Sequence, residues 1–322
     1  MENVVLLADP KTPVWGFAEK IKDYIKSTYL ADANLNEVSI NSFRNGEIDM
    51  EVPESVRQKD VYFIHDSNKN PAQWWTELLL LKDLLQSASA ETVSFVLPNM
   101  LYSRKDWKDR SHVPISARAL AASISPGLKR IITMDLHSAS IQGFYPSTVP
   151  LDNLSSFLPV SNYIKERENT FGRLEDLVIV TPDAGGAKRA KNFAKKSGSR
   201  YPIAIIDKRR DPINGKVIEM DFVGDVKDKN CLLFDDILDS GGTLCEASTI
   251  LKEKGAKKIY SYATHGLFTE GTEKICSCFD KVLVSNTHYR ESFPPVDIID
   301  ISPLFAEAIY RAQTGNSIST LY

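Results

Sequence analysis

The sequence has no apolar run that approaches the ~18 residues needed to cross a bilayer. Its N-terminal residues lead directly into a strand-like segment, Val4–Leu7, without the basic stretch and long apolar stretch of a secretory signal. Low-complexity segments and short-period repeats are also missing. We therefore expect a soluble, cytoplasmic protein with no membrane contact.

An excess of basic residues is also missing. The 39 Lys and Arg residues are balanced by 42 Asp and Glu residues, which gives a net charge of −3. A protein that binds nucleic acid non-specifically needs a basic surface to neutralise phosphates, so this balance gives no support to a nucleic-acid partner. Small phosphorylated ligands remain open, because they need only a local cluster of positive charge.

Cysteine is scarce, and no C-x-x-C pair occurs among Cys231, Cys245, Cys276 and Cys278. A zinc site at Cys276 and Cys278 would need a second pair of ligands at zinc-finger spacing, and none follows. In a cytosolic protein, such cysteines are typically reduced and mostly buried. We expect reduced thiols.

Short β-branched runs alternate with amphipathic helical patterns along the whole chain. Several of the runs are continuously apolar, which is typical of strands buried on both faces of a parallel sheet. The alternation predicts an α/β fold with mainly parallel sheets flanked by helices. The expected strands are Val4–Leu7, Val61–Ile64, Val93–Leu97, Ile131–Met134, Val178–Val180, Ile203–Ile206, Cys231–Phe234, Ile259–Ala263 and Val282–Val284. The clearest expected helices are Phe17–Tyr29, Ala72–Gln86, Ile115–Ser123, Ala187–Lys196 and Thr243–Lys254.

A length of 322 residues suggests about two domains. The stretch Gly143–Pro159 contains three prolines that interrupt any regular pattern, so we expect the domains to be 1–150 and 151–322. The last helix is a candidate to pack on the first domain. Both halves follow a similar order of strands and helices, which suggests a duplicated domain.

The stretch Lys208–Gly215 carries four charged residues, one proline and one glycine. It can be a solvated connector or a mobile loop over a site. Its place after the strand Ile203–Ile206 favours the second interpretation, because ligands of open α/β sheets bind at the carboxyl ends of strands.

The most informative segment runs from Cys231 to Thr243, where an apolar strand leads into Asp235-Asp236 and then into a glycine-rich turn that opens a helix. Glycines let backbone N–H groups approach an anion, and a helix N-terminus adds partial positive charge. Carboxylates beside a phosphate site are suited to accept hydrogen bonds from sugar hydroxyls or to help hold Mg²⁺. We expect Asp235 and Asp236 to face ribose hydroxyls. The residues expected to hold the 5-phosphate are Asp239, Ser240, Gly241, Gly242 and Thr243. The plain alternative is a strand followed by a helix capped by Ser240.

This segment resembles the ribose-5-phosphate loop shared by phosphoribosyltransferases and ribose-phosphate diphosphokinases. The rest of the chain, from about Phe43 to the C-terminus, resembles the phosphate-regulated class of the diphosphokinases, with its sequence blocks in the family's order. The blocks are Ser42–Glu47, Tyr102–Arg104, Pro114–Ala117, Met134–His137, Ile141–Phe144, Thr181–Lys188 and Asp207–Arg210. The resemblance implies two tandem phosphoribosyltransferase-like domains and transfer of the β,γ-diphosphoryl group of ATP to O1 of ribose 5-phosphate. It further implies Mg²⁺ as cofactor and a homo-oligomer, a dimer-based hexamer.

His137 and Asp183 each follow an expected strand, so both can point at a cleft from the carboxyl end of a sheet. Mg²⁺ prefers oxygen, which makes Asp183 the plainer ligand, and a hydrogen-bonded histidine is the alternative for His137. The resemblance of the Asp-Leu-His segment to the family's metal-binding histidine favours a metal role for both residues.

The resemblance assigns nucleotide binding to six residues. An aromatic ring suits stacking on adenine, polar groups suit its edge, and a guanidinium suits bridging phosphate and base. These ATP-binding candidates are Phe43, Asn45, Glu47, Arg104, Asp109 and His137.

Lys208 and Arg210 match the catalytic pair of the family. Phosphoryl-type transfer needs positioning and positive charge where the migrating group gathers negative charge, and a loop carrying both residues meets that requirement. The alternative for a run of charges is a solvated loop.

The resemblance also implies control by phosphate and ADP at a separate site. Hydroxyl groups and a guanidinium are good partners for phosphate. The allosteric candidates are Ser55, Arg57, Gln142, Asp152, Ser317 and Ser319. For Ser317 and Ser319 the alternative is a frayed terminus.

Two substitutions depart from the family pattern near the nucleotide candidates. Lys105 stands where Gln is usual, and Trp107 stands where a basic residue is common.

Two other functions compete with that of the active enzyme. A non-catalytic regulatory subunit is expected to lose the Lys208 and Arg210 pair, which is intact, and a ligand-sensing repressor would need a DNA-binding domain and a basic face.

Overall fold

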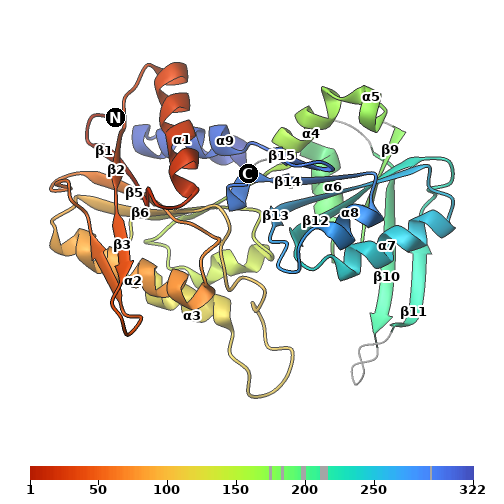
Figure 1. The fold of residues 1–322 in the computed structure, drawn as a ribbon, viewed down its shortest axis with the longest axis horizontal. Helices are drawn as coiled ribbons and strands as arrows, with labels where there is room; N and C mark the ends of the chain where they lie inside the picture. The colour runs from red at the N-terminus through yellow and green to blue at the C-terminus, as the bar shows by residue number, and fades with distance from the viewer. Residues whose placement is uncertain (174–175, 183–184, 197–200, 211–216, 291) are drawn as a thin grey trace. The chain divides into compact units, whose positions relative to one another are not determined.

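The computed structural model describes residues 1–173, 176–182, 185–196, 201–210, 217–290 and 292–322, and the side chains of 207–210 and 217–221 are outside this description. The chain divides into two compact units (Figure 1). Unit 1 comprises Met1–Ser155, Thr287–Arg290 and Ile301–Tyr322, and unit 2 comprises Ser156–Asn286 and Glu291–Asp300. The division between Ser155 and Ser156 lies within the proline-interrupted stretch Gly143–Pro159.

Unit 1 is built on a 6-stranded parallel sheet of order β2-β1-β5-β6-β7-β8. A separate antiparallel hairpin follows β2. The strands of the sheet are β1 (Val4–Ala8), β2 (Asn34–Glu37), β5 (Asp60–Ile64), β6 (Thr92–Leu97), β7 (Arg130–Met134) and β8 (Leu151–Leu154), and those of the hairpin are β3 (Ser39–Ser42) and β4 (Ile48–Glu51).

Helices cover both faces of this sheet. Alternate residues of β1 face opposite ways, so Leu6 packs with Phe17 of α1 and Phe305 of α9, while Leu7 packs in the cluster that holds Trp74 of α2. The helices of unit 1 are α1 (Val14–Tyr29), α2 (Pro71–Ser87), α3 (Ser116–Ile124) and α9 (Ser302–Thr314), with the 3₁₀ turns η1 (Ala139–Phe144), η3 (Asn286–His288) and η4 (Ser319–Leu321). The last helix of the chain therefore belongs to the core of the first unit.

Unit 2 is built on a 7-stranded sheet of order β11-β10-β9-β12-β13-β14-β15. All neighbours are parallel except β10 and β11, which form an antiparallel pair. The strands are β9 (Leu177–Thr181), β10 (Ile203–Arg210), β11 (Val217–Val223), β12 (Asn230–Leu238), β13 (Lys258–Gly266), β14 (Lys281–Ser285) and β15 (Val296–Ile299).

Two groups of helices cover the sheet of unit 2. Phe157 of α4 and Phe193 of α6 pack in the same cluster as Ile179 and Leu232, whereas Leu244 of α7 and Ile275 of α8 pack in the cluster of Val180 and Leu233, on the opposite face. The helices are α4 (Phe157–Lys165), α5 (Glu168–Phe171), α6 (Ala187–Lys196), α7 (Gly242–Glu253) and α8 (Glu273–Cys278).

The two sheets share one strand order. Without the antiparallel strands β3, β4 and β11, the order in unit 1 is β2-β1-β5-β6-β7-β8 and the order in unit 2 is β10-β9-β12-β13-β14-β15. In each unit the second strand along the chain lies on one side of the first, and all later strands of the sheet lie on its other side. The two hairpins also correspond, since β3–β4 follows β2 and β11 follows β10. The predicted α/β fold with parallel sheets is confirmed, and the shared order supports duplication of one domain.

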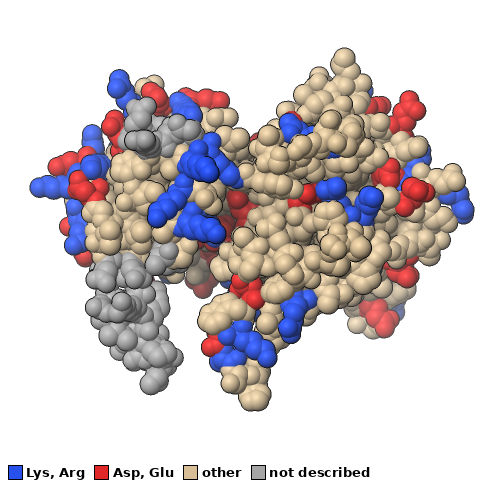
Figure 2. All heavy atoms as spheres, turned by 180° about the vertical axis from the view of Figure 1, so that it is seen from behind, with Lys and Arg blue, Asp and Glu red and all other residues tan. Residues whose placement is uncertain are grey.

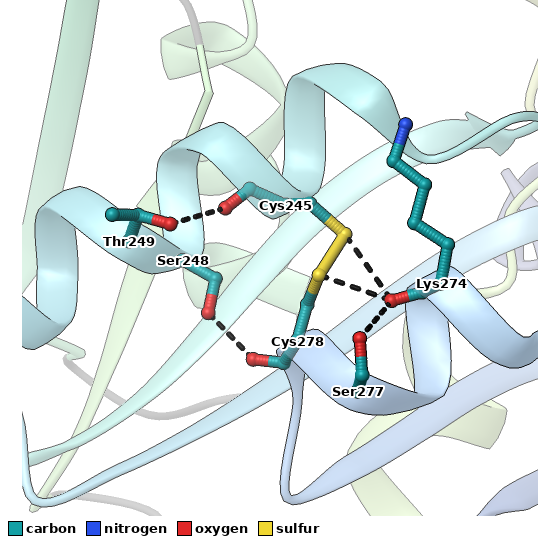
Figure 3. Close-up of a disulfide and its surroundings, with 6 residues drawn as sticks. All are labelled: Cys245, Ser248, Thr249, Lys274, Ser277 and Cys278. Atoms are coloured by element: carbon teal, nitrogen blue, oxygen red, sulfur yellow. Dashed lines mark hydrogen bonds between the residues drawn. A yellow bond between two sulfur atoms is a disulfide. The ribbon is translucent and has the colours of Figure 1, made fainter.

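The expectation of reduced cysteines is wrong. Cys245 in the first turn of α7 and Cys278 at the end of α8 form a disulfide, with Cα atoms 5.4 Å apart (Figure 3). Cys231 is a buried thiol and Cys276 is a half-buried one. The pairing arises because α7 and α8 pack together on one face of the sheet, which a separation of 33 residues does not reveal in the sequence.

In the part of the chain that the structure describes, no helix combines the length and the apolar character needed to span a membrane.

Candidate functional site

The central segment of the site is the end of β12 and the start of α7, in unit 2. β12 pairs with β9 only from Asn230 to Leu233, but continues beside β13 as far as Leu238. Asp235 and Asp236 therefore lie where β12 has passed its pairing with β9. From β9 the chain leaves to β10 on one side and later returns to β12 on the other, which makes this a topological switch point, the usual ligand position in an open α/β sheet.

Asp235 and Asp236 share one arginine. Arg189, in the first turn of α6, places Nη1 at 3.0 Å from Oδ1 of Asp235 and at 2.8 Å from Oδ1 of Asp236. The backbone N–H of Asp236 also donates to Oδ1 of Asp235, at 2.9 Å. Within the described residues, no hydrogen bond or ion pair engages Oδ2 of Asp235. That oxygen is left to accept a hydrogen bond from a ligand.

The two carboxylates repel each other at close range. Burial, followed by the charge of Asp236, raises the pKa of Asp235 from 3.8 to about 7, and Arg189 opposes the rise. A sequence with one fewer carboxylate would have no such conflict. A cost of this kind is typical of a functional site, where ligand groups rather than protein groups complete the charge balance.

The turn after β12 leaves backbone N–H groups at the start of α7 without a side-chain cap. Gly241 has a φ of +75°, and no side chain of the described residues caps the helix. The plain alternative, a helix capped by Ser240, is therefore not what the structure has, since Gly241 is the N-cap residue. The Asp239 side chain is held by Thr269, whose hydroxyl donates a hydrogen bond to Oδ1 of Asp239. A 12-residue helix whose first N–H groups are open offers an anion both donors and partial positive charge.

Three predicted residues of unit 2 fall where side chains are not described. Asp183 lies outside the described residues. The backbone of Lys208 and Arg210 belongs to the end of β10, facing β11, and their side chains lie outside the description. The described part of the charged stretch, from Lys208 to Arg210, thus belongs to a strand that pairs antiparallel with β11.

The predicted adenine-contacting residues lie at the tip of the β3–β4 hairpin. Phe43 and Glu47 close the hairpin, with N–H of Phe43 donating to the carbonyl of Glu47 at 2.8 Å, and Gly46 turns the chain at a φ of +88°. The Asn45 side chain accepts from the N–H of Glu47 at 3.2 Å. The Phe43 ring is 57% exposed, which leaves its face open to another planar group.

The nucleotide candidates Arg104 and Asp109 lie on the segment between β6 and α3. Nζ of Lys105 contacts Oδ2 of Asp109 at 2.5 Å, and this bond lowers the pKa of Asp109. Arg104 is exposed. On the face drawn in Figure 2, basic and acidic side chains both occur, with uncharged surface between them. Because Lys105 pairs with Asp109, the departure from the family pattern at Lys105 changes the surroundings of Asp109 directly. A lysine neutralises the carboxylate, which the usual glutamine would leave charged.

His137 is exposed and follows the end of β7 after a bend at Asp135, whose φ is +40°. The bend is tied to β8, since Asn153 Oδ1 accepts from the N–H of Leu136 at 3.0 Å. The structure therefore places His137 at the carboxyl end of its strand.

Of the predicted regulatory residues, Asp152 is buried and occupied. It pairs with Arg130 and accepts a hydrogen bond from the hydroxyl of Tyr322 at 2.5 Å. Ser317 and Ser319 lie 2.8 Å apart through their hydroxyls, and Arg311 donates to the carbonyl of Ser317 at 2.8 Å. The C-terminal residues are thus held by several bonds rather than frayed.

The remaining regulatory candidates lie on other segments of unit 1. Ser55 and Arg57 are exposed on a turn, where the Ser55 hydroxyl accepts from the N–H of Arg57 at 3.5 Å, and Gln142 is exposed in η1. The structure brings Asp152 and the C-terminal segment together. Among the described contacts, no hydrogen bond joins the turn of Ser55 and Arg57, or Gln142, to Asp152 or to the C-terminal segment.

Arg189 is the residue that sequence reasoning missed. The signal was present: Arg189 stands near the start of a helix that follows a strand, and a basic residue there faces the neighbouring strand's carboxyl end.

The comparisons with known proteins agree over both units. Residues 14–126 match the N-terminal domain of ribose phosphate pyrophosphokinase, and residues 210–322 match the phosphoribosyl synthetase-associated domain. The ribose-phosphate pyrophosphokinase of Campylobacter jejuni is 36% identical over 310 residues, which cover 95% of each chain. Ribose-phosphate pyrophosphokinase 4 of Saccharomyces cerevisiae is 39% identical over 294 residues, 89% of this chain and 87% of the yeast protein.

A solved structure extends the agreement to the fold. Phosphoribosylpyrophosphate synthetase from Mycobacterium smegmatis superposes with a TM-score of 0.83 at 32% identity, and the match covers 98% of this chain and 100% of that one. With two matched domains in the expected order and relatives aligned along almost their whole length, the chain belongs to the ribose-phosphate pyrophosphokinase family, the phosphoribosylpyrophosphate synthetases.

Proposed function

We propose that the chain transfers the β,γ-diphosphoryl group of ATP to O1 of ribose 5-phosphate, giving phosphoribosyl diphosphate and AMP. The observation that carries this proposal is the β12–α7 segment. It combines two adjacent carboxylates on Arg189 with an uncapped helix start. Carboxylates accept from sugar hydroxyls, and open N–H groups donate to phosphate, so one short segment can recognise both ends of a sugar phosphate.

In the ribose site, Asp235 and Asp236 accept hydrogen bonds from ribose hydroxyls, and the residues from Asp239 to Thr243 hold the 5-phosphate. Oδ2 of Asp235 is the acceptor that the described contacts leave available. Arg189 is a positioning residue, because it fixes the Oδ1 atoms of both carboxylates.

For the transfer itself, Lys208 and Arg210 supply positive charge to the migrating diphosphoryl group. Their place at the end of β10 supports this role, since β10 neighbours β9 at the switch point. Such groups act by stabilising charge that develops in the transition state.

ATP binds through the residues of unit 1 that the family resemblance assigns. Phe43 stacks on adenine, which fits its exposed ring, while Asn45 and Glu47 address the edge of the base. Arg104, Asp109 and His137 contribute to the same nucleotide site, with Lys105 partly neutralising Asp109.

Mg²⁺ is the proposed cofactor, held by His137 and Asp183. The described residues contain no group of three or more acidic, His or Cys side chains arranged as a metal cage. That donor set still fits Mg²⁺, which is usually held by one or two protein ligands together with substrate phosphates and water. When bound, the ion neutralises charge on the polyphosphate. The exposed side chain of His137 would approach that ligand sphere from the carboxyl end of β7.

The decisive experiment measures AMP formation by the purified chain with ATP, Mg²⁺ and ribose 5-phosphate. We expect AMP to form only when ribose 5-phosphate is present. If no AMP forms although the chain is folded and binds ribose 5-phosphate, the catalytic proposal fails, and a regulatory subunit that assembles with an active partner becomes the better account.

We further propose that phosphate and ADP act as effectors through Ser55, Arg57, Gln142, Asp152, Ser317 and Ser319. These residues lie on separate segments of unit 1, so one site can form from them only through packing of the C-terminal segment on that unit or through a second copy of the chain. The assembly that we propose is a dimer-based homo-hexamer. A comparison of phosphate activation in the wild type and Arg57→Ala tests the effector site. Light scattering at the same phosphate concentrations tests the assembly. Coincident activation curves for the two proteins would remove the effector proposal.

A cytoplasmic location is proposed because ATP and ribose 5-phosphate are intracellular substrates. The disulfide is unusual for that compartment. Trapping the thiols in whole cells and measuring how much of Cys245 and Cys278 is paired would test whether the two statements hold together.

A further inference from the structure

The short helix α8 packs directly against the glycine turn at the start of α7. A Cβ added to Gly241 would lie 2.3 Å from Cγ1 of Ile275, so the side chain of Ile275 occupies the space beside this glycine. Ile275 is buried, and it belongs to the same apolar cluster as Leu244 of α7. The conformation of the turn therefore depends on α8 as well as on its own glycines.

Two bonds fix α8 to α7. The disulfide joins Cys245 to Cys278, and the hydroxyl of Ser248 donates to the carbonyl of Cys278 at 2.7 Å (Figure 3). The carbonyl of Lys274 accepts from the hydroxyl of Ser277 at 2.7 Å and lies 3.7 and 3.1 Å from the two disulfide sulfurs. The backbone of Lys274 is thus held beside the first turn of α7.

The side chain of Lys274 runs from this fixed point toward the glycine turn. Nζ of Lys274 lies 4.0 Å from the position of a Cβ on Gly242, the first residue of α7. Figure 3 shows the side chain extended alongside the first turn of that helix. Neither a hydrogen bond nor an ion pair is described for its ammonium group, although Lys274 is exposed and its neighbour Glu273 is engaged with the N–H of Thr272.

We propose that Lys274 is a binding residue for the 5-phosphate of ribose 5-phosphate, a contact made from α8 in addition to those of the Asp239–Thr243 turn. This inference rests on the proposed function, and it names the group that supplies a full positive charge where the turn supplies only N–H groups. A lysine ammonium is a compact cation suited to a phosphate, which carries close to two negative charges near neutral pH.

The test compares Lys274→Gln, Lys274→Arg and the control Lys252→Gln, which removes the same charge from the far end of α7. We expect Lys274→Gln to raise KM for ribose 5-phosphate about five- to twentyfold, as loss of one charge-assisted contact does, with kcat and KM for ATP nearly unchanged. Lys274→Arg should restore most of the affinity. Lys252→Gln should leave KM unchanged.

Two further measurements separate binding from a structural role. The wild type should lose affinity for ribose 5-phosphate more steeply with added salt than Lys274→Gln does, because only the wild type keeps the ion pair. Both Lys274 variants should bind ribose, which lacks the phosphate, with the same affinity as the wild type. If the role of Lys274 were purely structural, Lys274→Gln would instead have a lower melting temperature and would bind ribose more weakly as well.

Calorimetric titration with ribose 5-phosphate, without ATP, keeps this inference distinct from the proposed reaction. If the wild type binds the sugar phosphate through Lys274 but forms no AMP, the reaction is wrong and the binding residue stands. If the wild type forms AMP and Lys274→Gln binds ribose 5-phosphate as tightly as the wild type, the inference about Lys274 is wrong and the reaction stands.

Discussion

The segment after β5 in unit 1 and the segment after β12 in unit 2 occupy the same place in two sheets of one strand order. In unit 1 the donors of this segment are used internally. The Asn70 side chain accepts from the N–H of Ala72 and caps α2, and Pro71 has no N–H to offer. Lys69 contacts Asp9 at 3.3 Å and Glu77 at 2.9 Å, so its charge is neutralised within the unit.

In unit 2 the equivalent donors are left open. α7 starts at Gly242 without a side-chain cap, and the nearby cation comes from a different helix, α8. The two segments show that topology supplies only the position of a ligand site. Whether the position binds an anion depends on whether the N–H groups and the cation are already satisfied by the protein.

The largest expected effect concerns the β10–β11 hairpin of unit 2, compared with the β3–β4 hairpin of unit 1. Lys208→Ala and Arg210→Ala should each lower kcat by roughly 10²–10³, the loss typical for one transition-state charge contact, with much smaller changes in KM. Phe43→Ala in the other hairpin should instead raise KM for ATP about fivefold or more, because one stacking contact with the base is lost. Steady-state kinetics of the three variants checks the contrast. Full kcat in either hairpin variant of unit 2 would make that residue a bystander.

Breaking the disulfide should loosen only the segment of unit 2. A loop of 33 residues is closed by Cys245 and Cys278, and the chain-entropy estimate for such a loop is about 3–4 kcal/mol of unfolding free energy. Urea unfolding with and without reductant measures this loss. Because α8 carries Ile275 and Lys274, KM for ribose 5-phosphate should rise as well. The Cys245→Ser, Cys278→Ser double variant should not respond to reductant, and an unchanged KM for reduced wild type would mean that packing alone holds α8.

Gly241→Ala tests whether the turn needs its left-handed residue. The φ of +75° costs a non-glycine residue about 1–2 kcal/mol, and the new Cβ would contact Ile275. We expect a loss of stability of about 2 kcal/mol and at least tenfold weaker binding of ribose 5-phosphate, roughly what a displaced donor causes. Gly255→Ala is a matched control, since Gly255 has a φ of +82° but lies beyond the end of α7. It should lose stability without losing affinity.

The carboxylate pair gives the site in unit 2 a pH dependence near neutrality. Since the pKa of Asp235 is raised to about 7, lowering the pH from 8 to 6 protonates it and removes an acceptor for ribose, so affinity for ribose 5-phosphate should fall about tenfold. The substrate phosphate titrates in the same range, and Asp235→Asn isolates the protein group because it keeps the side-chain shape. A KM profile with the same slope in both proteins would assign the dependence to the substrate.

The same shift predicts the sign of a stability change. An acid whose folded pKa is raised binds more protons in the folded state, so wild-type stability should decrease as the pH rises from about 4 through 7. Asp235→Asn should lack this decrease and be the more stable protein at pH 8. Melting temperatures of the wild type and Asp235→Asn, measured from pH 4 to pH 8, check both the decrease in the wild type and the higher stability of the variant at pH 8.

The smallest effect is expected at the cap of α2. Asn70→Ala removes the side chain that accepts from Ala72 and should cost about 1 kcal/mol of stability. Kinetic constants for ribose 5-phosphate should stay the same. A changed KM would show that the segment after β5 contributes to ligand binding after all.

The sequence was sufficient for the parts of the fold that local patterns encode. Strands such as β9 and β12 were predicted because both faces are buried and their residues are continuously apolar. β8, with only Leu151–Leu154 at the end of a sheet and flanked by prolines, gave no such run. Pro159 sits in the first turn of α4, where a proline is tolerated, so it did not interrupt the helix as expected.

The candidate site divides in the same way. Asp235, Asp236 and the glycine turn are contiguous in the chain, so their chemistry could be read directly. Arg189, Cys278 and Lys274 reach the same place from other elements, and only packing of α6 and α8 brings them there. The role of Asp152 was equally hidden, because its partners Arg130 and Tyr322 stand 22 and 170 residues away.

The position of α9 has a consequence for synthesis on the ribosome. Phe305 and Ile309 complete the apolar cluster formed by α1 and β1, yet they are made after all of the unit 2 sheet. Unit 2 has its full set of strands once Ile299 has emerged, whereas the face of the unit 1 sheet that α1 packs on stays incomplete until α9 has emerged. A nascent chain of this protein therefore exposes part of its first-made apolar surface longest, and the interval before α9 emerges is when it most needs protection from aggregation.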